Sequence, residues 1–293
     1  MPYLSGLTLL APDDMRMNYP VRLAILDMNN NCENMGIASI KRIADRFAII
    51  DYEVFDVRHK KEMPGLDFDI YISSGGPGNP LEYEGGWEKE YYELLDRIWE
   101  HNASGDEKKY VFFICHSFQM ICDHLGIGKI MLRDKESFGI VPVDKTEAGE
   151  KEPLFKALND PFYGADFRKY EVIHPDQSKL NQLGAVITAI EKTEDKNIAE
   201  KALMAIRFSK EWFGTQFHPE AHPDGMLMYL RRRDKKDMIL KTYGSNTYEE
   251  MMHNAIHPDR LTITRDHILP GFLSDAIDHI MTHSDAQPLV VNG

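Results

Sequence analysis

The sequence predicts an α/β fold, a doubly wound and mostly parallel sheet with helices on both faces. Short apolar runs of strand length occur at 21–28, 68–73 and 109–114, and segments with helical spacing of apolar residues lie between them. Continuous apolar runs of this length are typical of strands that are buried on both faces. Strands that alternate with helices in this way favour parallel βαβ units.

The first part of the chain supplies the elements of this sheet in order. Three asparagines at 29–31 end the first strand, and Gly126 can end the last helix. The expected strands are 21–28, 48–57, 68–73 and 109–114, and the expected helices are 35–47, 87–101 and 116–125.

After Gly126 the pattern changes to short strands separated by loops, with one brief helix near 154–158. This arrangement suits an antiparallel extension or late strands of the same sheet. The expected strands are 137–143, 170–173, 185–190, 202–208 and 212–217, followed by a helix at 226–233.

The pattern divides the chain into an N-terminal extension at 1–20, an α/β domain at 21–233 and a helical C-terminal appendage at 234–293. The appendage is more polar, and two helices are expected in it, at 248–256 and 272–281. The appendage also contains Gly244-Ser245-Asn246 and Pro270-Gly271, which lie outside both expected helices.

The composition is ordinary for a soluble globular protein and narrows the choice of partners. The 293 residues include 43% hydrophobic and 28% charged side chains, and the formal net charge is -13, so nucleic acid is not an expected partner. Three cysteines without paired spacing argue against a disulfide framework and a thiolate zinc site. The N-terminal segment lacks a secretory pattern, and no apolar run approaches the length of a membrane span. We therefore expect a cytoplasmic protein without a membrane partner.

The most informative motif is the apolar run 111–114, which leads directly into Cys115 and then into a helix-like segment. Most free cysteines are small buried hydrophobes, and position alone favours that interpretation. A catalytic cysteine needs a helix N-terminus and a neighbouring histidine to form its thiolate. A strand–turn–helix elbow places Cys115 beside such a helix end, so its context favours a nucleophile.

A second apolar run, 212–217, ends in His218-Pro219-Glu220. An imidazole at the end of a strand is held rigidly, and a carboxylate two residues later can orient it and stabilise imidazolium. The His-Pro-acid pattern recurs along the chain, and His222 is the rival base. His218 is preferred because it directly follows a well-formed strand and is paired with glutamate.

The third component is the sequence Ser-Gly-Gly-Pro-Gly at 74–78, which follows an expected strand. A plain turn is the commoner meaning of such a sequence. Glycine also lets backbone N–H groups approach the oxyanion of a tetrahedral intermediate. A phosphate loop is disfavoured because no lysine follows at the required spacing.

Together these motifs resemble the class I (triad) glutamine amidotransferase superfamily. The resemblance runs from about residue 21 to 233, and it is carried by SGGPG at 74–78, ICHSFQ at 114–119 and FHPE at 217–220. It implies a flavodoxin-like α/β domain that hydrolyses the side-chain amide of glutamine and needs neither a cofactor nor a metal. The segment 137–140 looks like the family segment that follows the elbow.

The resemblance also implies roles for individual residues. Cys115 would form a γ-glutamyl thioester, with His218 as base and then acid, and Glu220 orienting the imidazole. The backbone N–H groups of Gly76 and His116 would make the oxyanion hole. The substrate-binding residues implied in the same way are Gly75 and Gln119.

Two residues depart from the family elbow, which usually reads Gly-Xaa-Cys-Xaa-Gly. Phe113 stands two residues before Cys115 and Ser117 two residues after it. Ser117 is small enough to be tolerated, whereas Phe113 suggests a reshaped pocket wall or an altered elbow. The usual histidine-serine segment is also hard to find, and 168–171 occupies that region.

Three functions remain open from the sequence. The leading one is a glutamine amidohydrolase that passes ammonia to an acceptor on another chain, such as a separate synthetase subunit. The second is a related cysteine hydrolase that acts on γ-glutamyl compounds or peptides, and the third is a non-catalytic binding or regulatory protein. A homo-oligomer is also possible, because the helical appendage could cover the site or make a dimer contact.

Overall fold

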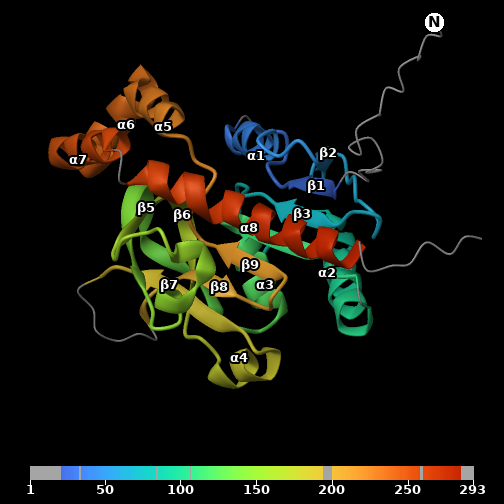
Figure 1. The fold of residues 1–293 in the computed structure, drawn as a ribbon. Coiled ribbons are helices and arrows are strands. Elements are labelled where there is room, and N and C mark those ends of the chain that lie inside the picture. Colours follow the sequence, from blue (N-terminus) through green and yellow to red (C-terminus); the bar gives the residue numbers. More distant parts are fainter. Residues whose placement is uncertain are drawn as a thin grey trace, which may run out of the picture.

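The computed structural model describes residues 21–284, except 33, 84, 106, 194–199 and 258–259, so the expected extension at 1–20 lies outside the described residues. The described strands form one mixed sheet in the order β2-β1-β3-β4-β9-β8-β7-β5-β6 (Figure 1). None of the described helices is long and apolar enough to cross a membrane.

One half of the sheet is parallel. It contains β1 (Val21–Asp27), β2 (Ile50–Asp56), β3 (Ile70–Ser73), β4 (Tyr110–Ile114) and β9 (Trp212–Thr215). Every residue of β3, β4 and β9 is buried, as expected of strands covered on both faces. The predicted doubly wound, mostly parallel fold is therefore confirmed.

The other half of the sheet is antiparallel. It contains β5 (Lys129–Lys145), β6 (Phe162–Ile173), β7 (Val186–Glu191) and β8 (Leu203–Arg207). Both β5 and β6 are longer than the expected strands 137–143 and 170–173. Much of β5 is polar and exposed, so an alternation of apolar residues does not mark its full length. The length of β5 is set by its pairing with β6.

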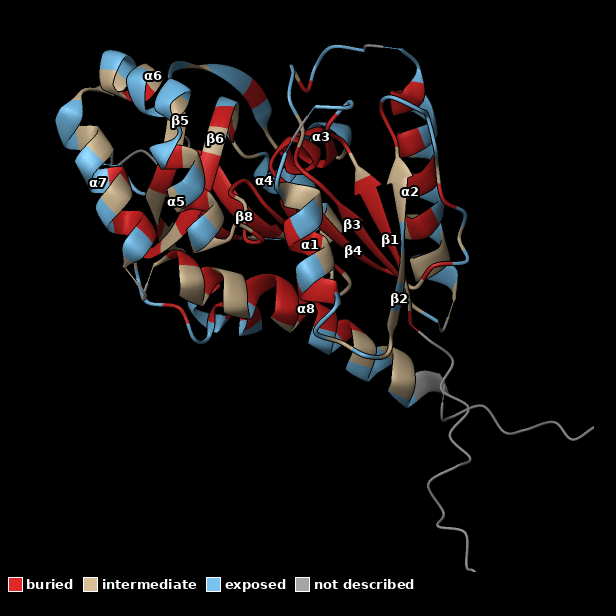
Figure 2. Cartoon of the chain, turned by 90° about the horizontal axis from the view of Figure 1, so that it is seen from above, coloured by how far each residue is buried: buried red, intermediate tan, exposed pale blue. Residues whose placement is uncertain are grey.

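Helices cover both faces of the sheet (Figure 2). The helices α1 (Gly36–Ala44) and α8 (Leu261–Ser284) pack on one face, and α2 (Trp87–Ser104) and α3 (His116–His124) pack on the other. The brief helix expected near 154–158 is a 3₁₀ turn, η3 (Pro153–Phe155), preceded by η2 (Gly149–Lys151). The helix α4 (Gln177–Leu183) was not predicted, because only Leu180 of its residues is buried and no apolar stripe marks it.

The C-terminal region contains α5 (Pro223–Arg231), α6 (Arg233–Tyr243), α7 (Ser245–Ile256) and α8. The described residues from 233 onward form three helices, so the expectation of two helices in this region is wrong. The expected helix 272–281 is the later part of α8, which begins at Leu261 and runs through Pro270-Gly271.

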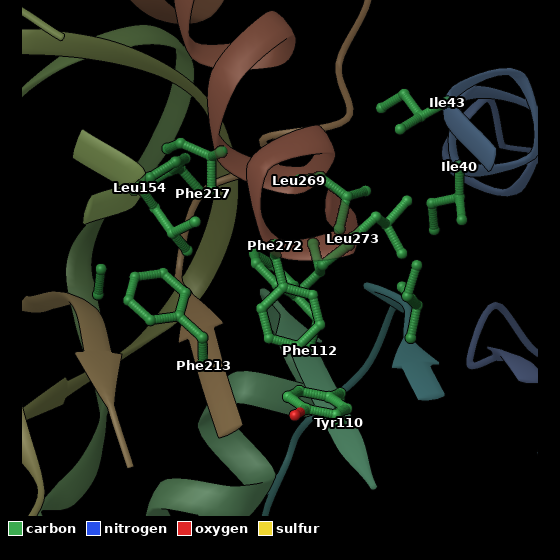
Figure 3. Close-up of a cluster of buried hydrophobic side chains, with 14 of the residues drawn as sticks. Ile40, Ile43, Tyr110, Phe112, Leu154, Phe213, Phe217, Leu269, Phe272 and Leu273 are labelled. Atoms are coloured by element: carbon green, nitrogen blue, oxygen red, sulfur yellow. The ribbon is translucent and has the colours of Figure 1, made fainter. Parts of the chain in front are cut away.

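Tertiary packing explains why α8 continues past its proline. An interior proline costs about 3 kcal/mol, whereas each large apolar side chain that becomes fully buried contributes about 1.5–3 kcal/mol. Around the proline, Leu269, Phe272 and Leu273 are buried against the sheet, and the ring of Phe272 lies 5.2 Å from that of Phe112 (Figure 3). The division at residue 233 stays a prediction, but α8 shares the main core.

Candidate active site

Cys115 lies at a sharp turn between β4 and α3. Its φ of 51° and ψ of -100° are unusual for a residue with a side chain, and such backbone strain costs about 1–3 kcal/mol. The surrounding structure holds the turn, since the N–H of Cys115 donates to Thr215 O at 2.8 Å and its carbonyl accepts from Gln119 N at 3.0 Å. Strain of this kind occurs where a nucleophile is presented at the end of a strand.

Ser117 braces this elbow from within the core. Its fully buried hydroxyl oxygen accepts from Ile114 N at 2.9 Å, and the hydroxyl donates to Ser73 O at 2.7 Å. The serine therefore links the elbow to the end of β3, a bond that a glycine at this position could not make.

Replacing Ser117 by alanine is expected to lower the free energy of unfolding by about 1–3 kcal/mol, because a buried N–H and a buried carbonyl lose a partner. Chemical denaturation measures the change. The matched control is Ser104→Ala, which removes an exposed hydroxyl from α2 and should change the free energy by less than about 0.5 kcal/mol. Equal effects of the two substitutions would contradict the bracing role.

Phe113 fills the core behind the elbow and does not reshape the wall of the site. Its ring is fully buried and lies 5.4 Å from that of Trp212 and 5.9 Å from that of Phe208. The neighbouring strand provides the space, because Phe113 pairs with Gly214, where an added Cβ would lie 3.2 Å from Phe113 Cβ and 2.9 Å from Phe118 Cδ2. The family elbow usually has a glycine at the position of Phe113 on β4. Here Gly214 on the neighbouring strand β9 provides the space instead.

His218 follows β9 and is held by an isolated bridge to β6, in which its N–H donates to Ala165 O at 2.7 Å. Its Nδ1 lies 2.8 Å from Glu220 Oε1, and an added Cβ on Gly75 would lie 2.6 Å from His218 Cε1 and 3.5 Å from Cys115 Cβ, so the imidazole and the cysteine flank the same glycine. Glu220 is 3% exposed, and its Oε2 has no hydrogen-bond partner among the described residues. The structure therefore brings together the three side chains predicted as a triad.

The electrostatics of His218 favour its charged form. Burial by itself lowers the pKa of His218, but the negative charges of Glu220 and Cys115 outweigh burial and raise that pKa well above its ordinary value. A protonated imidazole beside a sulfur favours the thiolate form of that sulfur.

The rival base is placed differently. The Nδ1 of His222 accepts from Asp224 N at 3.2 Å and so caps the start of α5. Burial and then the positive charge of Arg265 lower the pKa of His222. The structure thus gives His222 a capping role.

The glycine loop after β3 lies against the triad. An added Cβ on Gly75 would lie 2.6 Å from His218 Cε1 and 3.5 Å from Cys115 Cβ, so only glycine fits there. On Gly76 an added Cβ would lie 2.1 Å from Met28 O. The hydroxyl of Ser74 ties the loop to β1 by accepting from Met28 N at 3.0 Å.

Two backbone N–H groups, one in the glycine loop and one at the start of α3, are candidates to bind an oxyanion. His116 is the first residue of α3, so its N–H has no intrahelical acceptor. Within the described part of the chain, the backbone bonds of the glycine loop do not use the N–H of Gly76. These are the two donors that the family resemblance implies for an oxyanion hole.

The side chain of His116 is 4% exposed, and it is neutral near neutral pH. Burial and then the positive charge of Arg58 lower the pKa of His116 from 6.5 to about 3. Between these two pH values the unfolded chain binds a proton that the folded chain does not bind.

This difference predicts that His116 makes the protein sensitive to acid. The contribution of neutral His116 to the free energy of unfolding is fully present above pH 6.5. It is lost as the pH falls toward about 3, at about 1.4 kcal/mol per unit of pH. The free energy of unfolding of His116→Gln should fall less steeply over this range, as measured by denaturation at a series of pH values. His267→Gln, which replaces an exposed histidine on α8, should keep the wild-type slope. A wild-type slope in His116→Gln would contradict the prediction.

Gln216 also lies beside the sulfur, and Gln119 is bonded to Gln216. Gln119 Nε2 donates to Tyr170 O at 2.7 Å and to Gln216 Oε1 at 3.0 Å, and Gln216 Nε2 lies 3.6 Å from Cys115 Sγ. Sequence reasoning missed Gln216, although its position two residues before His218 places both on the same side of an extended chain.

Helices α5–α7 pack beside this site. The ring of Phe167 lies 6.2 Å from that of His218 and 5.9 Å from that of Tyr229 on α5. Gly139, in the segment 137–140, has a φ of 117°, and an added Cβ would lie 3.0 Å from Met251 on α7. Among the described residues, no group of three His, Cys, Asp or Glu side chains is arranged to hold a metal ion.

Comparisons of structure show the same fold in proteins of low sequence identity. The protein SMU.1228c aligns with 87% of this chain and 99% of its own, at a TM-score of 0.59 and 19% identity. A glutamine amidotransferase from Thermotoga maritima aligns with 88% of this chain and 98% of its own, at a TM-score of 0.58 and 16% identity. The glutaminase domain of CTPS from Trypanosoma brucei, solved with bound acivicin, aligns with 68% of this chain and 86% of its own, at a TM-score of 0.50 and 16% identity.

Comparison of sequence gives the family. A search of curated proteins finds no significant match. The family model for class I glutamine amidotransferases matches residues 29–233, which is more than half of the chain and includes the glycine loop, the elbow and His218 with Glu220. The chain therefore belongs to the class I glutamine amidotransferase family.

Proposed function

We propose that this chain hydrolyses the side-chain amide of glutamine to glutamate and ammonia through a γ-glutamyl thioester on Cys115. The observation that carries the proposal is the arrangement of Cys115, His218 and Glu220, with His218 Nδ1 bound to Glu220 and with Cys115 and His218 on either side of Gly75. Family membership supports glutamine as the amide donor.

In the first half of the reaction, His218 holds the proton of the Cys115 thiol, and the resulting thiolate attacks the amide carbon of glutamine. An S–C bond forms while the carbonyl π bond opens, and the N–H groups of Gly76 and His116 stabilise the resulting oxyanion. The C–N bond then breaks, and His218 gives the proton to the leaving nitrogen, which departs as ammonia. Glu220 orients the imidazole and stabilises its charged form in both steps.

In the second half, water attacks the thioester carbon and gives a proton to His218. The C–O bond forms, the S–C bond breaks, and the proton returns to the sulfur as glutamate leaves. The sum is glutamine plus water to glutamate plus ammonia, without change of oxidation state. A metal ion or cofactor is not required for this balance.

We further propose that the ammonia is used by an acceptor site on another chain, such as a separate synthetase subunit. Support comes from the family, which the matching model describes as amidotransferases. The protein that co-purifies with this chain from its native source is the observation that tests the acceptor.

The test of the amidase proposal uses the purified full-length protein with glutamine. Release of glutamate and ammonia in equal amounts is expected, together with covalent labelling of the Cys115 peptide by acivicin, which is bound in the Trypanosoma brucei CTPS structure. Glutamine should protect Cys115 from the label. If γ-glutamyl peptides are cleaved and glutamine is not, the related hydrolase function replaces this one, and absence of both activities with unlabelled Cys115 would favour a binding protein.

A further inference from the structure

Gln216 links the Cys115 sulfur to a chain of buried hydrogen bonds. It follows β9 and is fully buried, and its Nε2 lies 3.6 Å from Cys115 Sγ. Its Oε1 accepts from Gln119 Nε2 at 3.0 Å, and Gln119 Nε2 also donates to Tyr170 O at 2.7 Å. Gln119 is itself 3% exposed, so water does not compete freely for these bonds.

This chain of bonds determines which way both amides face. A backbone carbonyl only accepts, so the Gln119 nitrogen must face Tyr170 O. The second hydrogen of that nitrogen is then directed at Gln216, which must present its oxygen. The nitrogen of Gln216 is left facing the sulfur, and an amide nitrogen can donate a hydrogen bond but cannot accept one.

The consequence is a preference for one form of the nucleophile. A donor directed at a sulfur stabilises the thiolate, which accepts strongly, more than the thiol, which accepts weakly. We propose that Gln216 is a further catalytic residue of this chain, whose amide donates to the Cys115 thiolate, and that Gln119 is the positioning residue that orients Gln216. The inference rests on the proposed role of Cys115 as nucleophile.

The same geometry alters the role that the resemblance implies for Gln119. Both hydrogens of its side-chain amide bond to acceptors within the protein. The nitrogen of Gln119 therefore acts on the sulfur through Gln216, and its Oε1 is left to accept from a bound substrate. His218 and Gln216 have different roles at Cys115. The histidine exchanges the proton, and the glutamine stabilises the charge left on sulfur.

The experiment measures the rate at which iodoacetamide alkylates Cys115 in the full-length protein, over the pH range in which thiols titrate. Mass spectrometry of the Cys115 peptide gives the rate, and the Cys32 peptide in the same digest is an internal control because Cys32 is exposed. In Gln216→Met, which has a similar length and no donor, the midpoint of the Cys115 profile should rise by about one pH unit. That shift corresponds to about tenfold less thiolate below the midpoint, with little change in the plateau rate at high pH.

Two further variants separate an electrostatic role from a structural one. Gln216→Glu keeps the shape and places a carboxylate at the sulfur, so its midpoint should rise further than that of Gln216→Met. Gln119→Met should shift the midpoint in the same direction by a smaller amount, and the double variant Gln119→Met/Gln216→Met should match Gln216→Met alone. The neighbouring ionisable groups, His218 with Glu220 and His116 with Arg58, are the same in all variants.

An unchanged midpoint in both Gln216 variants would overturn the inference, as would equal slowing at every pH. Additive shifts in the double variant would overturn the positioning role of Gln119. Alkylation requires no turnover of glutamine, so the outcome is independent of the amidase assay. A shifted midpoint in a protein that does not hydrolyse glutamine would leave this inference standing and remove the proposed function.

Discussion

Replacing Cys115 by serine is expected to abolish the release of glutamate from glutamine and to leave the fold intact. A serine hydroxyl is far less ionised than a thiol beside His218, so the thioester pathway is lost, and we expect kcat to fall by at least about 10⁴-fold. The amidase assay measures the rate. Thermal unfolding should show a similar midpoint, because serine replaces the sulfur with a smaller atom and leaves the rest of the side chain unchanged.

The other two cysteines provide the controls for this prediction. Cys32 is exposed, and Cys32→Ser should retain full activity. Burial and then the negative charge of Asp123 raise the pKa of Cys122 well above its ordinary value, so Cys122 remains a thiol within the core. Equal activity in wild type and Cys115→Ser would remove Cys115 from the mechanism. Loss of activity in Cys32→Ser would contradict the assignment of Cys115 as the nucleophile.

Replacing Gly76 by alanine is expected to be the next most damaging change. The new Cβ would lie 2.1 Å from Met28 O and 3.2 Å from Arg58 Nη1, so the loop must move. Arg58 Nη1 also donates to Met28 O at 3.1 Å and to Pro77 O, which ties the same loop to β1. Movement of the loop displaces the N–H of Gly76 from the oxyanion, and loss of one such donor costs about 10²–10³-fold in kcat.

The steric clash should also lower the stability of Gly76→Ala, by about 1–3 kcal/mol. The matched control is Gly85→Ala in the following loop, where the nearest atom to an added Cβ is Lys61 Nζ at 3.9 Å. This control should keep wild-type kcat and stability. If Gly76→Ala is destabilised but keeps full kcat, the N–H of Gly76 is not a donor to the oxyanion.

Much of the parallel half of the sheet could be predicted because its signals are local. The strands β1, β3 and β4 are continuous apolar runs, and α3 begins directly after Cys115. The longer strands β5 and β6 were underestimated because their pairing joins residues far apart in the sequence, and exposed polar positions do not alternate with apolar ones. The helix α4 depends on the cap at Asp176, whose side chain accepts from Lys179 N at 3.0 Å, rather than on an apolar face.

The continuous helix α8 is a case in which tertiary packing outweighs a local preference against helix. Proline and glycine disfavour a helix at 270–271, and the sequence contains no sign that this face will be covered. The rings of Tyr110 and Phe112 on β4 contact Phe272, and this burial outweighs the local preference (Figure 3).

Short-range order in the sequence is enough to predict three parts of the site: the elbow at Cys115, the glycine loop before it and the His218-Pro219-Glu220 motif at the end of a later strand. Each is readable because a strand end and a turn require particular residue types within a few positions. How the atypical elbow is accommodated is visible only in the folded chain, where Gly214 on β9 makes room for Phe113 and Ser117 bonds to Ser73. Which glutamine faces the sulfur is also visible only there, since the hydrogen bonds from Tyr170 O to Cys115 join residues that only folding brings together.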